Sequence, residues 1–134
     1  MKKLVLLYSI FIAGGFAFFT QETELQKSMQ RGRELYTDFC VTCHLPNGEG
    51  VAGVFPPLAK SDYLLHNRVQ SIKAVKYGQQ GKITVNGKTY NTTMAPMGLT
   101  DEEVADVMNY ILNSWGNTDG KMVTVEEVKQ LKKD

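Results

Sequence analysis

The feature that most constrains this chain is a run of five residues, Cys40-Val41-Thr42-Cys43-His44. The whole sequence has only two Cys and two His, and three of these four residues fall within the run. Two thiols three positions apart on one helical turn can reach the two vinyl groups of a haem, and the adjacent imidazole can then bind the iron. The run therefore predicts one haem c, attached through Cys40 and Cys43, with His44 as a metal ligand.

Three other interpretations of the same residues have to be weighed. A C-x-x-C pair can carry out thiol–disulfide exchange, but that motif usually starts a helix in a strand-rich context, and few strands are expected here. A structural zinc site needs four ligands, and His66 is the one remaining nitrogen or sulfur donor of the usual kind. A disulfide across so short a loop would add little stability. Haem attachment is the interpretation that the motif favours.

The first twenty residues predict export. Two lysines precede an apolar run that begins at Leu4. A positive start and then an apolar run is the pattern of a secretory signal, and a run of this length can also remain as a membrane anchor. We expect residues 1–20 to be a signal peptide or an N-terminal anchor, with residues 4–20 in the membrane in the second case. Residues 21–134 would then lie in the periplasm or on the extracytoplasmic face of the membrane.

Length and charge limit the nature of the remaining chain. A sequence of 134 residues has room for one small domain. Hydrophobic residues make up 43% and charged residues 22%, which is ordinary for a globular protein. The net charge is +1, and the basic residues are scattered rather than clustered. No basic surface for a phosphate backbone is therefore expected, and nucleic acid is excluded as a partner.

The hydrophobic pattern predicts helices interrupted by one hairpin. Helical spacing runs through residues 21–39 and again through 61–77, the latter as two short helices. Between residues 83 and 90, apolar and β-branched positions flank Asn86-Gly87. Because Asn-Gly supplies the positive φ angles of a two-residue type I′ turn, a short hairpin is expected there.

Two further helices are predicted from capping boxes. Glu103 stands three residues after Thr100, and Glu127 stands three residues after Thr124. The first of these helices carries an apolar stripe formed by Val104, Met108, Ile111 and Trp115. The second is short and charged.

Further sequence blocks accompany the five-residue motif. In chain order they are Gly32-Arg-Glu-Leu35-Tyr36, Pro56-Pro57-Leu58-Ala59, Val85-Asn86-Gly87, Tyr90-Asn91, Met94-Ala95-Pro96, Leu99-Thr100-Asp101-Glu102-Glu103, Tyr110-Ile111 and Ser114-Trp115-Gly116-Asn117. With these blocks the chain resembles the class I c-type cytochromes, most closely the small domains found alone or attached to periplasmic dehydrogenases and haem-copper oxidases. The resemblance implies an all-α cytochrome c fold, with three to five helices around one covalently bound haem and a short hairpin. One position departs from the family, because Leu45 stands after His44 where Gly is usual, so the local turn must adapt.

The resemblance also implies particular roles. Gly32 would let the first helix cross the helix after Thr100 closely, near Tyr110. The carbonyl of Pro56 would accept a hydrogen bond from the ring of His44. Leu58 would pack on the haem, which makes Pro56 and Leu58 cofactor-binding residues.

The sixth iron ligand has three candidates, Met94, Met97 and His66. Met94 lies in a stretch without helical or strand spacing, where Pro96 biases the preceding residue to an extended conformation. The resemblance favours Met94, which stands five residues before Leu99 as in the family's ligand loop. Both Met residues could instead fill gaps in the core, and His66 could be an ordinary surface residue.

Together these expectations describe an electron carrier rather than an enzyme. Ligation by His44 and Met94 would leave no vacant iron position, and Met/His ligation raises the reduction potential. The expected function is outer-sphere transfer of single electrons between extracytoplasmic respiratory partners, such as a dehydrogenase, a quinol-oxidising complex or a terminal oxidase. Two alternatives stay open: a haem subunit of a larger oxidoreductase, and a sensor or peroxidase-like protein with an open distal site.

Overall fold

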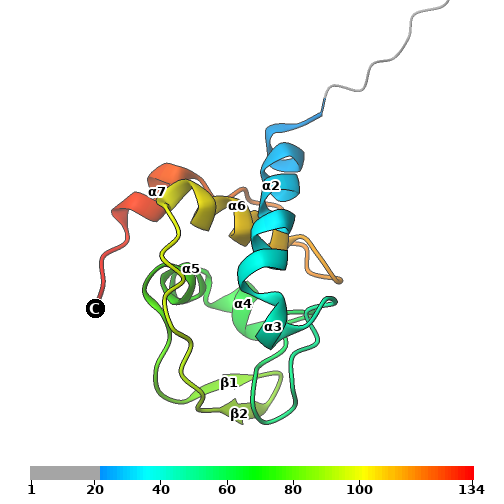
Figure 1. Cartoon of the computed structure of the whole chain (residues 1–134), viewed down its shortest axis with the longest axis vertical. Coiled ribbons are helices and arrows are strands. Elements are labelled where there is room, and N and C mark those ends of the chain that lie inside the picture. The colour runs from blue at the N-terminus through cyan, green and yellow to red at the C-terminus, as the bar shows by residue number, and fades with distance from the viewer. Residues whose placement is uncertain (1–21) are drawn as a thin grey trace, which may run out of the picture.

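The structure is a computed structural model that describes residues 22–134 (Figure 1). In chain order its elements are α2 (Glu24–Phe39), α3 (Val41–His44), α4 (Asp62–His66), α5 (Arg68–Tyr77), β1 (Ile83–Val85), β2 (Lys88–Tyr90), α6 (Asp101–Leu112) and α7 (Val125–Gln130). The predicted helical fold with a short hairpin is confirmed. Six helices lie within residues 22–134, against the three to five expected, because α3 and α4 are short helices of four and five residues.

The expected signal or anchor at residues 1–20 lies outside the described residues. Among the helices of residues 22–134, none is both long and apolar enough to cross a membrane. The predicted break within residues 61–77 is confirmed and falls at Asn67, which has φ −124° and ψ 51°.

The first described helix, α2, starts at Glu24 rather than at residue 21, because a capping box sets its start. Thr23 is extended, and its hydroxyl accepts a hydrogen bond from the Gln26 backbone N–H at 3.2 Å. The Gln26 side chain in turn accepts one from the Thr23 N–H at 2.8 Å. A capping box of this kind stabilises a helix start by about 1 kcal/mol.

The helices α2 and α6 cross in direct backbone contact (Figure 1). A Cβ on Gly32 would lie 2.0 Å from the carbonyl oxygen of Asp106 and 2.9 Å from the Cβ of Tyr110, so the predicted role of Gly32 is confirmed. The buried carboxylate of Asp106 accepts hydrogen bonds from Ser28 Oγ at 2.6 Å and from Arg31 Nε at 2.6 Å. Because a buried charge is costly unless it is paired, this network fixes where the two helices cross.

The helix α6 has the predicted start and most of the predicted buried face. Glu103 N–H donates to the Thr100 hydroxyl, and the Glu103 carboxylate accepts from the Thr100 N–H at 2.8 Å. Val104 and Met108 are 0% exposed and Ile111 is 3% exposed. This face of α6 therefore forms part of the hydrophobic core.

Trp115 does not belong to that helical stripe, so this part of the prediction is wrong. The helix ends at Leu112, and Trp115 adopts a φ of 52° in the turn after it. Its ring instead packs against Tyr36 at 4.9 Å and Tyr110 at 5.3 Å between centroids. The rings of Tyr36, Tyr110 and Trp115 thus pack together beside the point where α2 and α6 cross.

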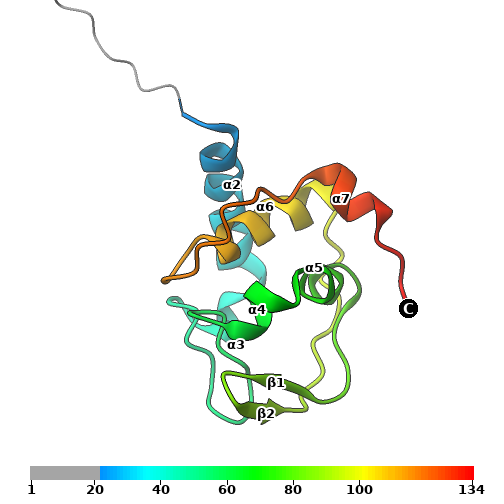
Figure 2. The ribbon, with the colours of Figure 1, turned by 180° about the vertical axis from the view of Figure 1, so that it is seen from behind.

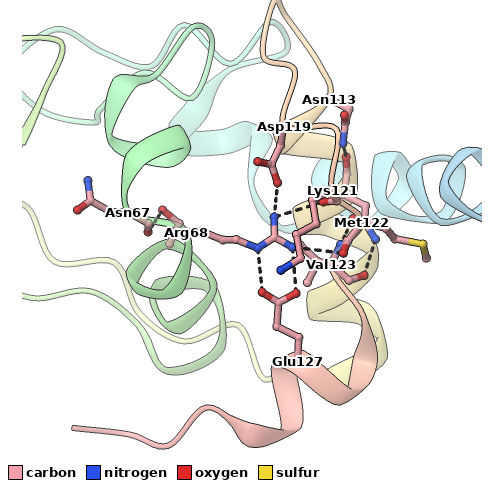
Figure 3. Close-up of polar contacts among 10 residues, drawn as sticks. Asn67, Arg68, Asn113, Asp119, Lys121, Met122, Val123 and Glu127 are labelled. Atoms are coloured by element: carbon pink, nitrogen blue, oxygen red, sulfur yellow. Dashed lines mark hydrogen bonds and ion pairs between the residues drawn. The ribbon is translucent and has the colours of Figure 1, made fainter.

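The last helix, α7, has only half of the predicted capping box. The Thr124 hydroxyl accepts from the Glu127 N–H at 3.1 Å. The Glu127 carboxylate does not turn back to Thr124 but accepts from Arg68 Nε and Nη2 at 2.8 and 2.9 Å (Figure 3). Arg68 also pairs with Asp119, so it joins α5 to the loop before α7 and to α7 itself.

The hairpin forms as predicted and is tied to α4. Asn86 and Gly87 have φ angles of 49° and 76°, as a type I′ turn requires. The Asp62 carboxylate accepts from the Asn86 N–H at 2.7 Å, and the Asn86 side chain accepts from the Asp62 N–H at 3.0 Å. Val85 and Tyr90 are buried, so one face of the hairpin is available to line the interior.

Candidate haem site

Figure 2 shows α3, α4 and α5 between the hairpin and α6. Residues of these elements line a cavity of about 360 Å³. Its wall contains Cys40, Cys43 and His44, and it also contains Met94 and Met97. The rest of the wall is mostly apolar and comes from α4, α5, α6, the hairpin and the loop at residues 55–58. One apolar cavity thus brings together two distant parts of the sequence.

The two cysteines sit at a tight junction between helices. Cys40 ends α2 with its N–H bonded to the Tyr36 carbonyl, and its own carbonyl accepts from the His44 N–H at 2.9 Å. Cys40 is 8% exposed, and burial, with a smaller contribution from Cys43, raises the pKa of its thiol to about 11. Both thiols are free and face the same cavity, as thioether attachment of one group requires.

His44 is held by a hydrogen bond to the backbone. Its ring Nδ1 lies 3.0 Å from the carbonyl oxygen of Pro56, which is the contact that the family resemblance implied. Because a carbonyl can only accept, Nδ1 carries the proton and Nε2 is left with a free lone pair. Burial lowers the pKa of His44, against the opposing effect of the Pro56 bond. The ring is therefore neutral at pH 7 and suited to bind a metal ion through Nε2.

In the turn after His44, Leu45 adopts a positive φ angle, a backbone conformation that favours glycine. Leu45 has φ 62° and ψ 163°, a region that a side chain makes costly. Its carbonyl accepts from the Tyr36 hydroxyl at 2.6 Å and from the Gly48 N–H at 3.1 Å. Leu45 therefore adopts a strained backbone conformation, and these two hydrogen bonds stabilise it.

The loop that bears Pro56 depends on a glycine that no motif in the sequence singled out. A Cβ on Gly50 would lie 2.6 Å from the Pro56 carbonyl oxygen, the same atom that binds His44. The Gly48 carbonyl accepts from the Leu58 N–H at 2.7 Å, which brings Leu58 to the cavity wall. Gly50 also has a φ of 62°, and the high glycine content of residues 48–53 was the available signal.

Met94 is held by a backbone pair that the sequence did not reveal. Its N–H donates to the Gln79 carbonyl at 2.9 Å, and the Gln79 N–H donates to the Met94 carbonyl at 2.8 Å. A Cβ on Gly78 would lie 2.7 Å from the Met94 carbonyl oxygen, so the approach needs glycine. The stretch around Met94 is therefore not free of pairing, since a single bridge joins it to the end of α5.

The other candidate ligands lie in different surroundings. Met97 also lines the cavity, but within residues 22–134 it makes no backbone pair like that of Met94. His66 is exposed on α4 and does not line the cavity. In the same part of the chain, no three His, Cys, Asp or Glu side chains gather into a metal site.

The residues present fit a haem. The cavity is apolar, it contains two free thiols at the spacing of the motif, and its wall includes a neutral imidazole whose second nitrogen is already bonded. A hydrogen bond of that kind orients a metal-binding histidine and fixes its tautomer. A thioether sulfur is available in the same wall from Met94.

Comparisons with known proteins show what the chain is similar to. The family model described as cytochrome c matches residues 29–115. Cytochrome c-552 of Thermus thermophilus is 40% identical over 110 residues, which cover 75% of this chain and 83% of the relative. The cytochrome c subunit of a quinone-dependent alcohol dehydrogenase of Gluconobacter oxydans is 29% identical over 75% of this chain and 22% of that subunit. The cytochrome c subunit of gluconate 2-dehydrogenase of Pantoea cypripedii is 31% identical over 87% of this chain and 28% of that subunit.

The matched region contains the features on which the site depends. It includes the α2–α6 crossing, both thiols, His44 and Met94. The family binds haem and transfers electrons, so the chain is an electron-transfer protein rather than an enzyme. This chain belongs to the cytochrome c family.

Proposed function

We propose that the chain carries single electrons through one haem c, which Cys40 and Cys43 would attach and whose iron His44 and Met94 would bind. The observation that carries this proposal is that all four residues line one apolar cavity, although Met94 is fifty residues from His44 in the sequence. When bound, the haem supplies the exchange of one electron between ferric and ferrous iron. The residues of the chain hold it, exclude water from it and set its potential.

Each ligand is held by the backbone before the group is bound. The Pro56 carbonyl fixes His44, and the Gln79 backbone fixes Met94. Ligands that are already in place need little rearrangement when the iron changes its charge. The apolar wall favours the less charged, reduced state of the iron.

Met94 is the better sulfur ligand of the two methionines. Both line the cavity, but the double hydrogen bond to Gln79 fixes the backbone of Met94 alone. Met94 is also one of the partly buried apolar residues that pack against the core. We therefore assign the axial position to Met94 and leave Met97 as part of the wall.

We infer that partners dock where the cavity reaches the surface. Phe39 lines the cavity and is also 44% exposed, which marks a place where the cavity wall becomes outer surface. Two of the relatives are cytochrome c subunits of dehydrogenases, which supports redox proteins as partners of this chain. A quinol-oxidising complex and a terminal oxidase remain alternatives of the same class. Such transient redox contacts usually bury less than about 1,200 Å².

The proposed site of action is outside the cytoplasm. Haem c is attached after export, and the charged and apolar pattern of residues 1–20 supports an export signal or an anchor. Mass spectrometry of the purified protein tests this point. A mature chain that starts near Thr20 indicates cleavage, an intact apolar segment recovered with membranes indicates an anchor, and an intact soluble chain without haem contradicts export.

The axial assignment is tested by replacing each methionine separately. Met94→Ala should abolish the weak far-red band that sulfur gives when bound to ferric iron, and it should lower the reduction potential. Met97→Ala should leave both unchanged and is the matched control in the same loop. The reverse result would assign Met97 to the iron. A band that persists in both variants would contradict ligation by either methionine alone. A wild type without the band, or a high-spin wild type that binds carbon monoxide rapidly, would favour the open-site alternative.

A further inference from the structure

The loop that bears Met94, residues 91–98, is held at two points by the C-terminal end of α5 and the residues just after it. Gln79, just after the helix, forms the double backbone pair with Met94. Lys76, in the last turn, pairs with Asp101 at 2.8 Å, and Asp101 is the first residue of α6, where the Met94 loop ends. Residues 91–98 lie in no helix or strand, so they have no regular hydrogen-bond ladder of their own. The two attachments to α5 therefore determine how firmly Met94 is held.

The same turn of α5 is held from outside by the C-terminal segment, residues 124–134. Lys76 Nζ donates to the Val128 carbonyl at 2.9 Å, and the Tyr77 hydroxyl donates to the Leu131 carbonyl at 2.9 Å. Lys73 also pairs with Asp134. This segment lies beyond residue 115, where the match to the family model ends.

The C-terminal segment is itself firmly placed. Val128 is 0% exposed in the core, and Arg68 binds Glu127 through two nitrogens (Figure 3). Two parallel bonds between a guanidinium and a carboxylate are among the strong, directional contacts in proteins. The segment can therefore act as a fixed support for α5 rather than as a loose tail.

The ammonium of Lys76, on α5, joins the start of α6 to α7. It bonds Asp101 and the Val128 carbonyl at once, and its side chain is only 15% exposed. The hydrogen bond to Asp101 raises the pKa of Lys76, so it stays charged at neutral pH. Removing the ammonium would release the end of the Met94 loop and the end of α7 together.

We propose that Lys76 and Tyr77 are positioning residues for Met94, and that residues 124–134 act through them to set how readily another ligand replaces Met94 at the iron. This inference rests on the proposed function, because it takes Met94 as the axial ligand. Neither side chain lines the haem cavity. Their effect on the iron therefore passes through Gln79 and Asp101.

The test uses the full-length ferric holoprotein and imidazole as the competing ligand. Imidazole binding is monitored by the loss of the far-red band and by the shift of the main haem band. Lys76→Met should raise the apparent affinity for imidazole roughly tenfold, since a charged hydrogen bond of about 1.5 kcal/mol no longer holds the loop. Tyr77→Phe removes one neutral hydrogen bond and should raise the affinity by a smaller factor, about threefold.

Two matched variants separate positioning from general loss of stability. Lys27→Met removes the same charge from an exposed pair with Glu24 on α2. Tyr36→Phe removes a hydroxyl bond to a backbone carbonyl, as Tyr77→Phe does, but the carbonyl is that of Leu45. Tyr36→Phe should lower the thermal midpoint, and both variants should leave the affinity for imidazole at the wild-type value.

The outcomes distinguish this inference from the proposed function. If Lys76→Met and Tyr77→Phe bind imidazole no better than their two controls, the positioning role is wrong, even where Met94→Ala shows that Met94 is the ligand. If Met94→Ala binds imidazole with the wild-type affinity, then Met94 is not on the iron, and the proposed ligation fails together with the inference. An increase confined to Lys76→Met and Tyr77→Phe supports the positioning role.

Discussion

The two sides of the haem cavity are built in different ways. On the His44 side, both thiols and the ring lie within five consecutive residues, and the partner of the ring, Pro56, is twelve residues away. On the Met94 side, the supports are Gln79 and Lys76 from earlier in the chain and Val128 from much later. The first side is specified by local sequence, whereas the second depends on tertiary contacts. Changes on the first side should therefore affect attachment, and changes on the second should affect ligand exchange.

The largest effect is expected from the thiols on the His44 side. With Cys40→Ala and Cys43→Ala combined, acidic acetone should extract all of the haem, because no thioether bond holds it to the chain. The wild type should keep its haem under the same treatment. Haem that still resists extraction from the double variant would show that attachment does not use these residues.

The next effect concerns the helix crossing on which both sides depend. Gly32→Ala would place a Cβ 2.0 Å from a backbone oxygen of α6, so α2 and α6 would have to move apart. We expect a loss of about 3 kcal/mol or more in the free energy of unfolding, measured by denaturant titration. Exposed Arg33, the next residue on α2, offers a control in Arg33→Ala, which should cost less than about 0.5 kcal/mol. Equal stability of the two variants would contradict the close crossing.

A smaller effect of opposite sign is expected beside His44. Leu45→Gly should stabilise the protein by about 1 kcal/mol, because glycine relieves the strain of φ 62° and ψ 163° at a smaller cost in chain entropy. The far-red band and the affinity for imidazole should not change, since Met94 lies on the other side. Denaturant titration and the two spectroscopic measurements check both parts. A less stable Leu45→Gly variant would mean that the side chain contributes more than the strain costs.

An effect of similar size, which depends on pH, is expected at the Arg68–Glu127 pair that supports the Met94 side. The hydrogen bond from Arg68 lowers the pKa of Glu127 below its ordinary value of 4.5. Its contribution to stability is therefore present above pH 4.5 and is lost as the pH falls through the lowered pKa of the folded protein. Glu127→Gln should cost about 1 kcal/mol at neutral pH and make stability depend less on pH below 4.5. Thermal midpoints from pH 7 down to pH 3 would measure this, and unchanged curves would show that the pair contributes nothing.

Sequence patterns predicted those parts of the fold that short stretches determine. The hairpin follows from the positive φ angles of Asn86-Gly87, and α6 follows from Thr100 and Glu103. Trp115 was misplaced because helical spacing continues past Leu112, although the chain turns there with a positive φ. Spacing alone does not indicate where a helix ends.

Long-range pairing explains what the sequence left open. The Glu127 carboxylate was expected to cap α7, but the guanidinium of Arg68, fifty-nine residues earlier, is a stronger partner. Gln79 was not singled out because its role comes from its backbone, and no side-chain pattern marks a backbone pair. In the sequence, the preference for Met94 over Met97 rests on the family resemblance. The backbone pair with Gln79, which gives a physical reason for the same choice, is seen only in the fold.

The most direct test of haem ligation by His44 and Met94 is the visible spectrum of the oxidised and reduced protein, produced together with haem-attachment machinery. We predict a sharp reduced spectrum of the c type and, in the oxidised form, the weak far-red band of sulfur bound to ferric iron. Attached haem without that band, or with high-spin iron, would contradict ligation by Met94. Protein that acquires no haem under these conditions would contradict haem binding by this chain altogether.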